Sequence, residues 1–122
     1  MPWELDSDRP IYAQIVDRLK HEIVSGFYPP GSRLPSVRDL AAQASVNPNT
    51  MQKAFTELER TGLIVTCRTS GRTVTEDTAL IEQVRSELAE LQISQFLTRM
   101  QHLGYQKDDS IRLLLAKKEE NS

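Results

Sequence analysis

The sequence predicts a mainly α-helical fold with one small β-hairpin: an N-terminal winged helix-turn-helix followed by a two-helix C-terminal dimerisation region. Three observations predict it. Residues 34–50 have the pattern of two short capped helices joined by a tight turn. Residues 63–75 have the pattern of a strand, a turn and a returning strand. Beyond residue 78, apolar residues recur at helical spacing.

Length and composition indicate a folded, soluble protein. The chain has 122 residues, enough for one domain or a small domain with an appendage, and 39% of them are hydrophobic, which supports a core. It shows no signal peptide and no apolar run long enough to span a membrane. We therefore expect a cytoplasmic protein without a membrane partner.

The residues that catalysis or metal binding needs are scarce. Cys67 is the only cysteine, and His21 and His102 are the only histidines. No CxxC or HExxH spacing and no glycine-rich phosphate loop occurs. We expect Cys67 to be an ordinary strand residue rather than a redox switch. We predict no enzymatic activity, no cofactor and no metal site.

Charge is distributed unevenly along the chain. The net charge is −2, which alone does not suggest a nucleic-acid partner. From Arg33 to Arg72, however, six basic and three acidic residues give a balance of +3, whereas the chain from Glu76 onward has six basic and nine acidic residues. The basic segment is the one that could bind phosphates, although +3 also falls within ordinary surface variation.

The first helix is predicted to start near Pro10. Its apolar face has a four-residue spacing: Ile11, Ile15, Leu19 and Ile23. Gly26 is expected just beyond its C-terminal end. Residues 1–9 form an N-terminal arm, whose Trp3 and Leu5 we expect to pack either against the domain or against a partner.

Local capping signals define the two helices of residues 34–50. Ser36 is expected to cap the first helix, with Asp39 in position for a capping box. Val46 should fill the turn. Asn47 is expected to cap the second helix, with Pro48 at its first position, where a missing N–H costs nothing.

The start of the second of these helices is polar and basic. Its first two turns carry Asn49, Thr50, Gln52 and Lys53. A capped helix presenting such side chains after a tight turn is the layout that places a helix in the DNA major groove. Helical hairpins without DNA-binding function share the caps, so this pattern alone leaves both interpretations open.

A hairpin is predicted to follow this helix. The helix should run from Pro48 to about Thr61, and Gly62 should end it. Residues 63–67 and 72–75 are expected to be strands, joined by a turn at 69–71. Three helices and a hairpin make a winged helix, which we assign to residues 10–76.

Residues 77–118 are predicted to form a helical dimerisation region, and residues 119–122 a frayed tail. Thr78 should cap a long helix that ends near Leu103, and a second helix should begin at Asp108 after a break at Gly104. The predicted dimerisation residues are apolar and lie along the long helix: Ile81, Val84, Leu88, Leu91, Phe96 and Met100. Two helices cannot bury this much apolar surface alone, so we expect a homodimer; the alternative is that both helices fold back onto the winged helix.

Several short motifs together resemble the N-terminal domain of GntR-family bacterial transcription regulators. They are Pro10-Ile11-Tyr12, Pro30-Gly31, Leu34-Pro35-Ser36 with Arg38, Asn47-Pro48-Asn49-Thr50, and Glu57-Leu58 followed by Gly62-Leu63-Ile64. The resemblance covers Pro10 to about Val74. A short helical C-terminal region is similar to that of the YtrA-type subfamily, and larger ligand-binding domains do not fit the length.

The resemblance implies double-stranded DNA as a partner. GntR proteins use the arginine that matches Arg38 at the DNA surface. Including the polar start of the reading helix and the wing, the predicted DNA-binding residues are Arg38, Asn47, Asn49, Thr50, Gln52, Lys53, Arg68, Gly71 and Arg72.

The wing departs from the family pattern. Many GntR proteins carry two glycines and an aromatic residue there, whereas this chain keeps Gly71 and has Thr73 at the aromatic position. Arg68 and Arg72 could compensate by binding phosphate or a narrow minor groove, or they could merely flank a solvated hairpin.

These features together predict a dimeric, sequence-specific DNA-binding regulator. We expect a repressor that reads a near-palindromic operator, and YtrA-type resemblance implies control of a transport operon. The alternative is a winged helix that binds proteins and has lost DNA binding. The sequence identifies no small-molecule effector.

Overall fold

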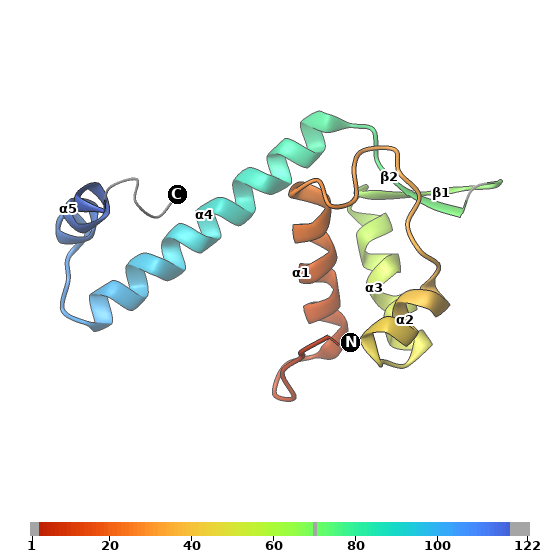
Figure 1. Ribbon diagram of the computed structural model, residues 1–122, viewed down its shortest axis with the longest axis horizontal. Coiled ribbons are helices and arrows are strands. Elements are labelled where there is room, and N and C mark those ends of the chain that lie inside the picture. The colour runs from red at the N-terminus through yellow and green to blue at the C-terminus, as the bar shows by residue number, and fades with distance from the viewer. Residues whose placement is uncertain (1–2, 70, 118–122) are drawn as a thin grey trace. The chain divides into compact units, whose positions relative to one another are not determined.

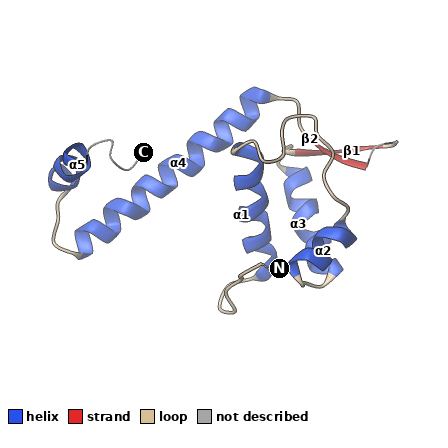
Figure 2. Ribbon diagram, viewed as in Figure 1, coloured by secondary structure: helices blue, strands red, loops and turns tan. Residues whose placement is uncertain are grey.

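The computed structural model describes residues 3–69 and 71–117 (Figure 1). The elements run in the order α1 (Ile11–Val24), α2 (Val37–Ala44), α3 (Pro48–Arg60), β1 (Ile64–Cys67), β2 (Gly71–Val74), α4 (Thr78–His102) and α5 (Lys107–Ala116). Helices dominate and the two strands form one antiparallel hairpin, as Figure 2 shows. The predicted fold class is confirmed.

The core of the first part of the chain is built by α1, α2 and α3. Helix α3 packs against both α1 and α2 and contacts β1 (Figure 1). The predicted spacing holds for Ile15, Leu19 and Ile23 of α1, which are all at most 1% exposed, whereas Ile11 at the start of the helix is half-buried. Phe55 of α3 is completely buried. Each such side chain contributes about 1.5–3 kcal/mol through burial, so α3 is held firmly by its inner face.

The strand β1 follows α3 almost directly. Thr61 is the C-cap of α3, and Gly62 then takes a φ of +87°, a conformation that other residues adopt at a cost. The Leu63 amide donates to the Leu58 carbonyl over 3.2 Å, which satisfies one of the free carbonyls at the helix end. The chain therefore reverses sharply here and leads into the hairpin.

The hairpin has a partial third strand. β1 and β2 pair from Ile64↔Val74 to Cys67↔Gly71. On the other edge of β2, Arg33 forms a bridge with Thr73, and the Leu34 amide donates to the Arg72 carbonyl over 2.9 Å. The segment before α2 is thus fixed along the wing, which the sequence analysis did not predict.

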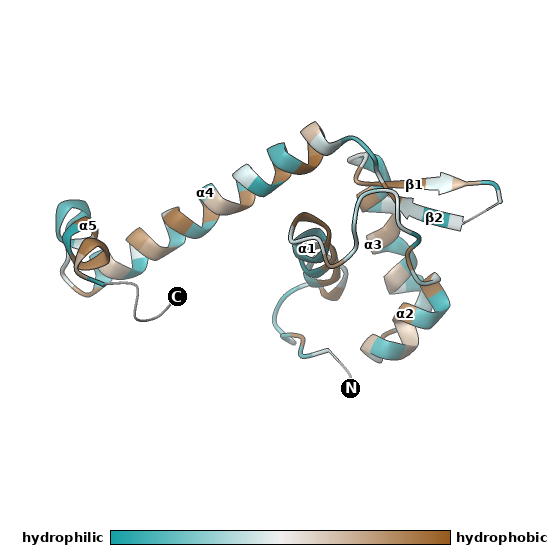
Figure 3. Cartoon of the chain, turned by 45° about the horizontal axis from the view of Figure 1, so that its top comes forward, coloured by the Kyte–Doolittle hydropathy of each residue, from teal (hydrophilic) through white to brown (hydrophobic). Residues whose placement is uncertain are grey.

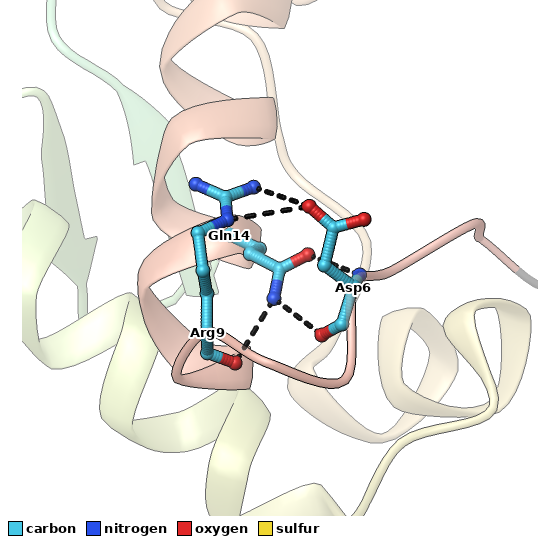
Figure 4. Close-up of polar contacts among 3 residues, drawn as sticks. All are labelled: Asp6, Arg9 and Gln14. Atoms are coloured by element: carbon cyan, nitrogen blue, oxygen red, sulfur yellow. Dashed lines mark hydrogen bonds and ion pairs between the residues drawn. The ribbon is translucent and has the colours of Figure 1, made fainter.

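The N-terminal arm packs on its own domain. Gln14 of α1 is 6% exposed, and its side chain makes all its hydrogen bonds to the arm (Figure 4). Its Oε1 accepts from the Asp6 amide over 2.7 Å, and its Nε2 donates to the carbonyls of Asp6 and Arg9 over 2.8 and 3.1 Å. The Arg18 guanidinium lies 4.1 Å from the centre of the Trp3 ring. Of the two alternatives for Trp3 and Leu5, the structure shows packing against the domain.

The beginning of α4 belongs to this first unit. Asp77, not Thr78, caps the helix, because the Asp77 carboxylate accepts from the Leu80 amide over 3.1 Å. Ile81 is 4% exposed. Arg85 donates from Nε and Nη2 to the Val24 carbonyl at the end of α1, over 3.0 and 2.7 Å. The division between two compact units accordingly falls inside α4, between Arg85 and Ser86, rather than before it at residue 76.

The second unit contains the rest of α4 and α5. Gly104, with a φ of +99°, separates the helices as predicted. Helix α5 begins at Lys107 instead of Asp108, because Gln106 and Asp109 form a capping box ahead of it. In Figure 3 hydrophobic colour recurs along both helices. The predicted frayed tail at 119–122 lies outside the described residues.

Candidate nucleic-acid interface

The turn between α2 and α3 is held by local backbone geometry. Ser45 takes a left-handed conformation, with φ 59° and ψ 47°, and ends α2. The Val46 amide then donates to the Ala41 carbonyl over 3.0 Å, and the Val46 side chain is half-buried in the turn. A fixed turn gives α3 a defined direction relative to α2.

The predicted caps on both helices are present. The Ser36 hydroxyl accepts from the Asp39 amide over 3.0 Å, and the Asn47 Oδ1 accepts from the Asn49 amide over 2.7 Å. Pro48 occupies the first position of α3. The side-chain oxygen of Asn47 is therefore used by the cap, while its side-chain NH2 group remains on the exposed surface.

Helix α3 separates a buried face from an exposed one. The core takes Met51, Ala54, Phe55 and Leu58. The exposed face carries Asn49, Gln52 and Lys53, whereas Thr50 is half-buried. Gln52 Nε2 donates to the Thr56 hydroxyl over 3.3 Å, which aligns its side chain along the helix. Three of the four predicted reading residues are thus on a common accessible surface.

A cavity adjoins the start of α3. It has a volume of about 370 Å³, and its walls include Trp3, Leu5, Val46, Asn47 and Thr50. The docked arm therefore reaches the neighbourhood of the helix-turn-helix turn. Thr50, on the wall of this cavity, is half-buried.

The basic side chains differ in what they already contact. Arg38 of α2 and Arg68 beside the hairpin turn are exposed, and within the described residues neither makes an ion pair or hydrogen bond. Glu57 of α3 engages neither of them, because its carboxylate pairs with Arg60. That hydrogen bond from Arg60 holds the pKa of Glu57 below its usual range.

Lys53 and Arg72 are engaged by their own chain. The Lys53 Nζ lies 4.0 Å from the centre of the Tyr12 ring. The Arg72 Nε lies 3.5 Å from the Glu59 carboxylate, its guanidinium carbon lies 5.3 Å from the centre of the Phe55 ring, and its side chain is 26% exposed. Lys53 remains exposed at the surface, but Arg72 points inward along the hairpin.

The wing keeps an accessible turn. Gly71 takes a φ of +73° and is exposed, and Cys67 opposite is half-buried with its sulfur 3.6 Å from the Thr73 hydroxyl. Ser70, the middle of the predicted turn, lies outside the described residues. The hairpin thus presents Arg68 and Gly71 to a ligand more directly than Arg72.

The predicted dimerisation residues fall into two groups. Ile81 is already buried by its own chain. Its side chain is therefore not available to a partner, contrary to the prediction. Leu91 is 52% exposed, and Val84, Leu88, Phe96 and Met100 are half-buried. Further exposed apolar residues of the second unit lie outside the predicted dimerisation set: Ile93, Leu103, Ile111, Leu113, Leu114 and Leu115.

Other kinds of site find no support in the part of the chain that the structure describes. There, no group of three His, Cys, Asp or Glu residues is close enough to hold a metal ion. None of the helices described is both long and apolar enough to cross a bilayer. The helix-turn-helix and the wing therefore remain the candidate binding surface.

Comparison with known proteins agrees with this geometry. Residues 11–74 match the model of "Bacterial regulatory proteins, gntR family". The chain belongs to the GntR family. The same segment contains α1, the helix-turn-helix and the hairpin, so the family assignment rests on the candidate interface itself.

Two Bacillus subtilis relatives extend the similarity beyond that segment. The transcriptional regulator YhcF is 34% identical over 108 residues, which cover 88% of this chain and 89% of YhcF. The transcriptional repressor YtrA is 40% identical over 100 residues, which cover 80% of this chain and 76% of YtrA. This GntR regulator therefore resembles short members of the family over most of its length.

Solved structures show the same fold. A GntR-family transcriptional regulator from Listeria monocytogenes is 40% identical, with a TM-score of 0.83, and the match covers 93% of this chain and all of the other. The DNA-binding domain of AraR, solved in complex with the operator ORX1, is 26% identical with a TM-score of 0.53 over 62% of this chain. The predicted resemblance to the GntR family and its YtrA-type members is confirmed.

Proposed function

We propose that this DNA-binding GntR regulator is a homodimeric repressor that reads a near-palindromic operator. The observation that carries the proposal is the exposed face of α3, where Asn49, Gln52 and Lys53 follow a fixed turn. Short polar and amide side chains on such a helix can pair with base edges in the major groove. AraR, which shares the fold, is seen on an operator.

The dimer is proposed from the apolar surface of the second unit. Leu91 and Ile93 of α4 are 52% and 57% exposed, and Leu114 and Leu115 of α5 are 57% and 77% exposed. Large apolar side chains left exposed in such number on one part of a soluble protein indicate an interaction site. A second copy of the chain is the simplest partner, because two-fold dimers present two reading helices to two half-sites.

Repression is proposed by analogy with YtrA, whose name describes it as a repressor. YtrA-type resemblance also leads us to propose that the target is a transport operon. Deleting the gene should raise transcripts of that operon in RNA sequencing. A fall in those transcripts would instead indicate an activator.

Binding to DNA is tested with the region upstream of the protein's own operon. We expect a footprint of two half-sites about 10 bp apart, protected on one face of the duplex. Affinity should fall steeply with salt, since phosphate contacts release counterions. The absence of salt-dependent binding to this region and to random duplex DNA would overturn the proposal in favour of a protein-binding winged helix.

A further inference from the structure

We infer that Arg33, and not Arg72, supplies the wing's contact to the DNA backbone, and that the hollow beside it accepts a phosphate group. The inference rests on the proposed function, because it assumes that the first unit binds duplex DNA. It assigns a role to a residue that lies outside both helices of the helix-turn-helix and outside the hairpin.

The backbone of Arg33 is fixed to the wing. It bridges to Thr73 of β2, and its neighbours lock the segment on either side: the Val74 amide donates to the Ser32 carbonyl, and the Leu34 amide donates to the Arg72 carbonyl, each over 2.9 Å. A cation on this partial strand therefore moves with the hairpin. The point from which its side chain extends is thus set before DNA arrives, so only the side chain has to be ordered on contact.

The Arg33 side chain extends toward the hairpin turn. A Cβ added to Gly71 would lie 3.8 Å from the Arg33 Nε and 3.9 Å from its Nη2. The residue is exposed, and within the described residues no carboxylate or carbonyl engages its guanidinium. All its donors are thus free for an incoming oxygen atom, and Gly71 leaves room for that oxygen to approach.

A hollow adjoins this guanidinium. It has a volume of about 130 Å³ and lies between the segment before α2, α3 and β2; its walls include Arg33, Ser36, Phe55, Gly71 and Arg72. This volume exceeds the about 30 Å³ that one water molecule occupies in the liquid. Two arginines on its walls make it favourable for an anion, and a phosphate of a duplex lying across α3 and the wing is the anion that this position would meet.

Arg72 has a different role in this arrangement. Its Nε lies 3.5 Å from the Glu59 carboxylate and its guanidinium packs near the Phe55 ring, so turning it outward would break both contacts. It holds β2 on α3 and adds positive charge to the wall of the hollow. The free guanidinium of Arg33 is the one that can bind phosphate in a bidentate manner.

The test compares salt dependence in four variants on one operator duplex and one random duplex. Arg33→Ala should reduce the slope of log affinity against log salt by about 0.9, so that between 50 and 200 mM salt it loses about 3-fold less affinity than the wild type. Arg33→Lys should keep the slope because it keeps the charge. Arg72→Ala should lower the melting temperature and leave the slope unchanged.

Arg60→Ala is the matched control. It removes the same charge from the same unit, at the C-terminal end of α3, where Arg60 pairs with Glu57, and it should leave the slope unchanged. A wild-type slope in Arg33→Ala would overturn the inference, as would loss of affinity on the operator alone, which would indicate a base contact. If the wild type itself fails to bind either duplex, it is the proposed function that fails.

Discussion

Lys53 and Arg38 carry the same charge but are held differently. Lys53 lies over the Tyr12 ring, a cation–π contact worth about 0.5–1 kcal/mol at an exposed site, whereas Arg38 makes no such contact within the described residues. The Tyr12 ring therefore positions the Lys53 ammonium at the edge of α3. Both side chains can still meet phosphates, because neither is buried.

Replacing either residue by alanine should weaken binding to all duplexes alike. Each variant should flatten the salt slope by about 0.9, since each loses one phosphate contact. Tyr12→Phe is the control for Lys53, because it keeps the ring and should bind like the wild type. Salt titrations by fluorescence anisotropy measure the slopes; a variant that keeps the full slope has no phosphate contact.

Gln52 should act on sequence preference rather than on overall affinity. Its amide can pair with adenine through two hydrogen bonds once it releases Thr56. Gln52→Ala should relax the preference at one or two base pairs, at about 1–3 kcal/mol each. Selection from a randomised operator library measures this. Equal weakening on every sequence would rule out Gln52 as a base reader.

Gln14 should hold the N-terminal arm in place. Gln14→Leu keeps the volume but removes three hydrogen bonds to the backbone of Asp6 and Arg9, each worth about 1 kcal/mol net. We expect a loss of about 1–3 kcal/mol in urea unfolding and faster proteolysis before Pro10. Asp8→Asn, at an exposed position of the same arm, should change neither. An arm that stays protected in Gln14→Leu would contradict this role.

At the scale of single elements, the wing differs most from its prediction, because Arg72 contacts Glu59 and Phe55 while Arg68 is exposed. Arg68 is exposed beside the turn, so it is the hairpin residue that can enter a minor groove. Arg68→Ala should then lose more affinity on operators with A·T-rich flanks, where the groove is narrow and more negative. Two operators that differ only in their flanks measure the difference. An equal loss on both would indicate a phosphate contact instead.

Elements whose signals are local could be predicted from the sequence. The caps at Ser36 and Asn47, and the glycine that ends α3, each depend on residues within a few positions. Their boundaries agree with the structure to within about two residues, the usual uncertainty for helix ends. The sequence leaves Asp77 and Thr78 as neighbouring cap candidates, because both residue types are preferred at this position, and the structure shows that Asp77 is the cap.

Features that depend on distant residues could not be predicted. The bridge between Arg33 and Thr73 carries no periodic pattern, since the partial strand is too short to show alternation. The contact of Arg85 with the end of α1 joins residues 61 positions apart. For this reason the sequence pattern places the first turns of α4, with Ile81, in the dimerisation region, although they belong to the first unit.

At the scale of the whole molecule, the exposed apolar side chains concentrate in the second unit. Only Phe27 and Val65 are large exposed hydrophobic residues of the described first unit, whereas eight such residues lie between Leu91 and Leu115. Figure 3 shows the same hydrophobic colour along α4 and α5. Because water contact with this surface is unfavourable by about 25 cal/mol per Å², a partner that covers it is favoured.

The dimer is tested by charging that surface. In Leu88→Asp combined with Leu91→Asp, two carboxylates would have to be buried unpaired at an interface, which is costly, so the variant should sediment as a monomer at micromolar concentration. The first unit should still fold, because both positions lie beyond the division at Arg85. Each monomer should then bind one half-site, with lower affinity and a footprint of half the length.

Gln92→Asp combined with Gln95→Asp is the matched control. It adds the same charge to the same helix at exposed polar positions, and it should remain dimeric if the apolar side chains, rather than net charge, hold the partner. A monomeric wild type at this concentration would contradict the proposed homodimer. A wild-type dimer that both double variants leave intact would place the interface elsewhere on the chain, and α5, with Leu114 and Leu115 exposed, would then be the surface to charge next.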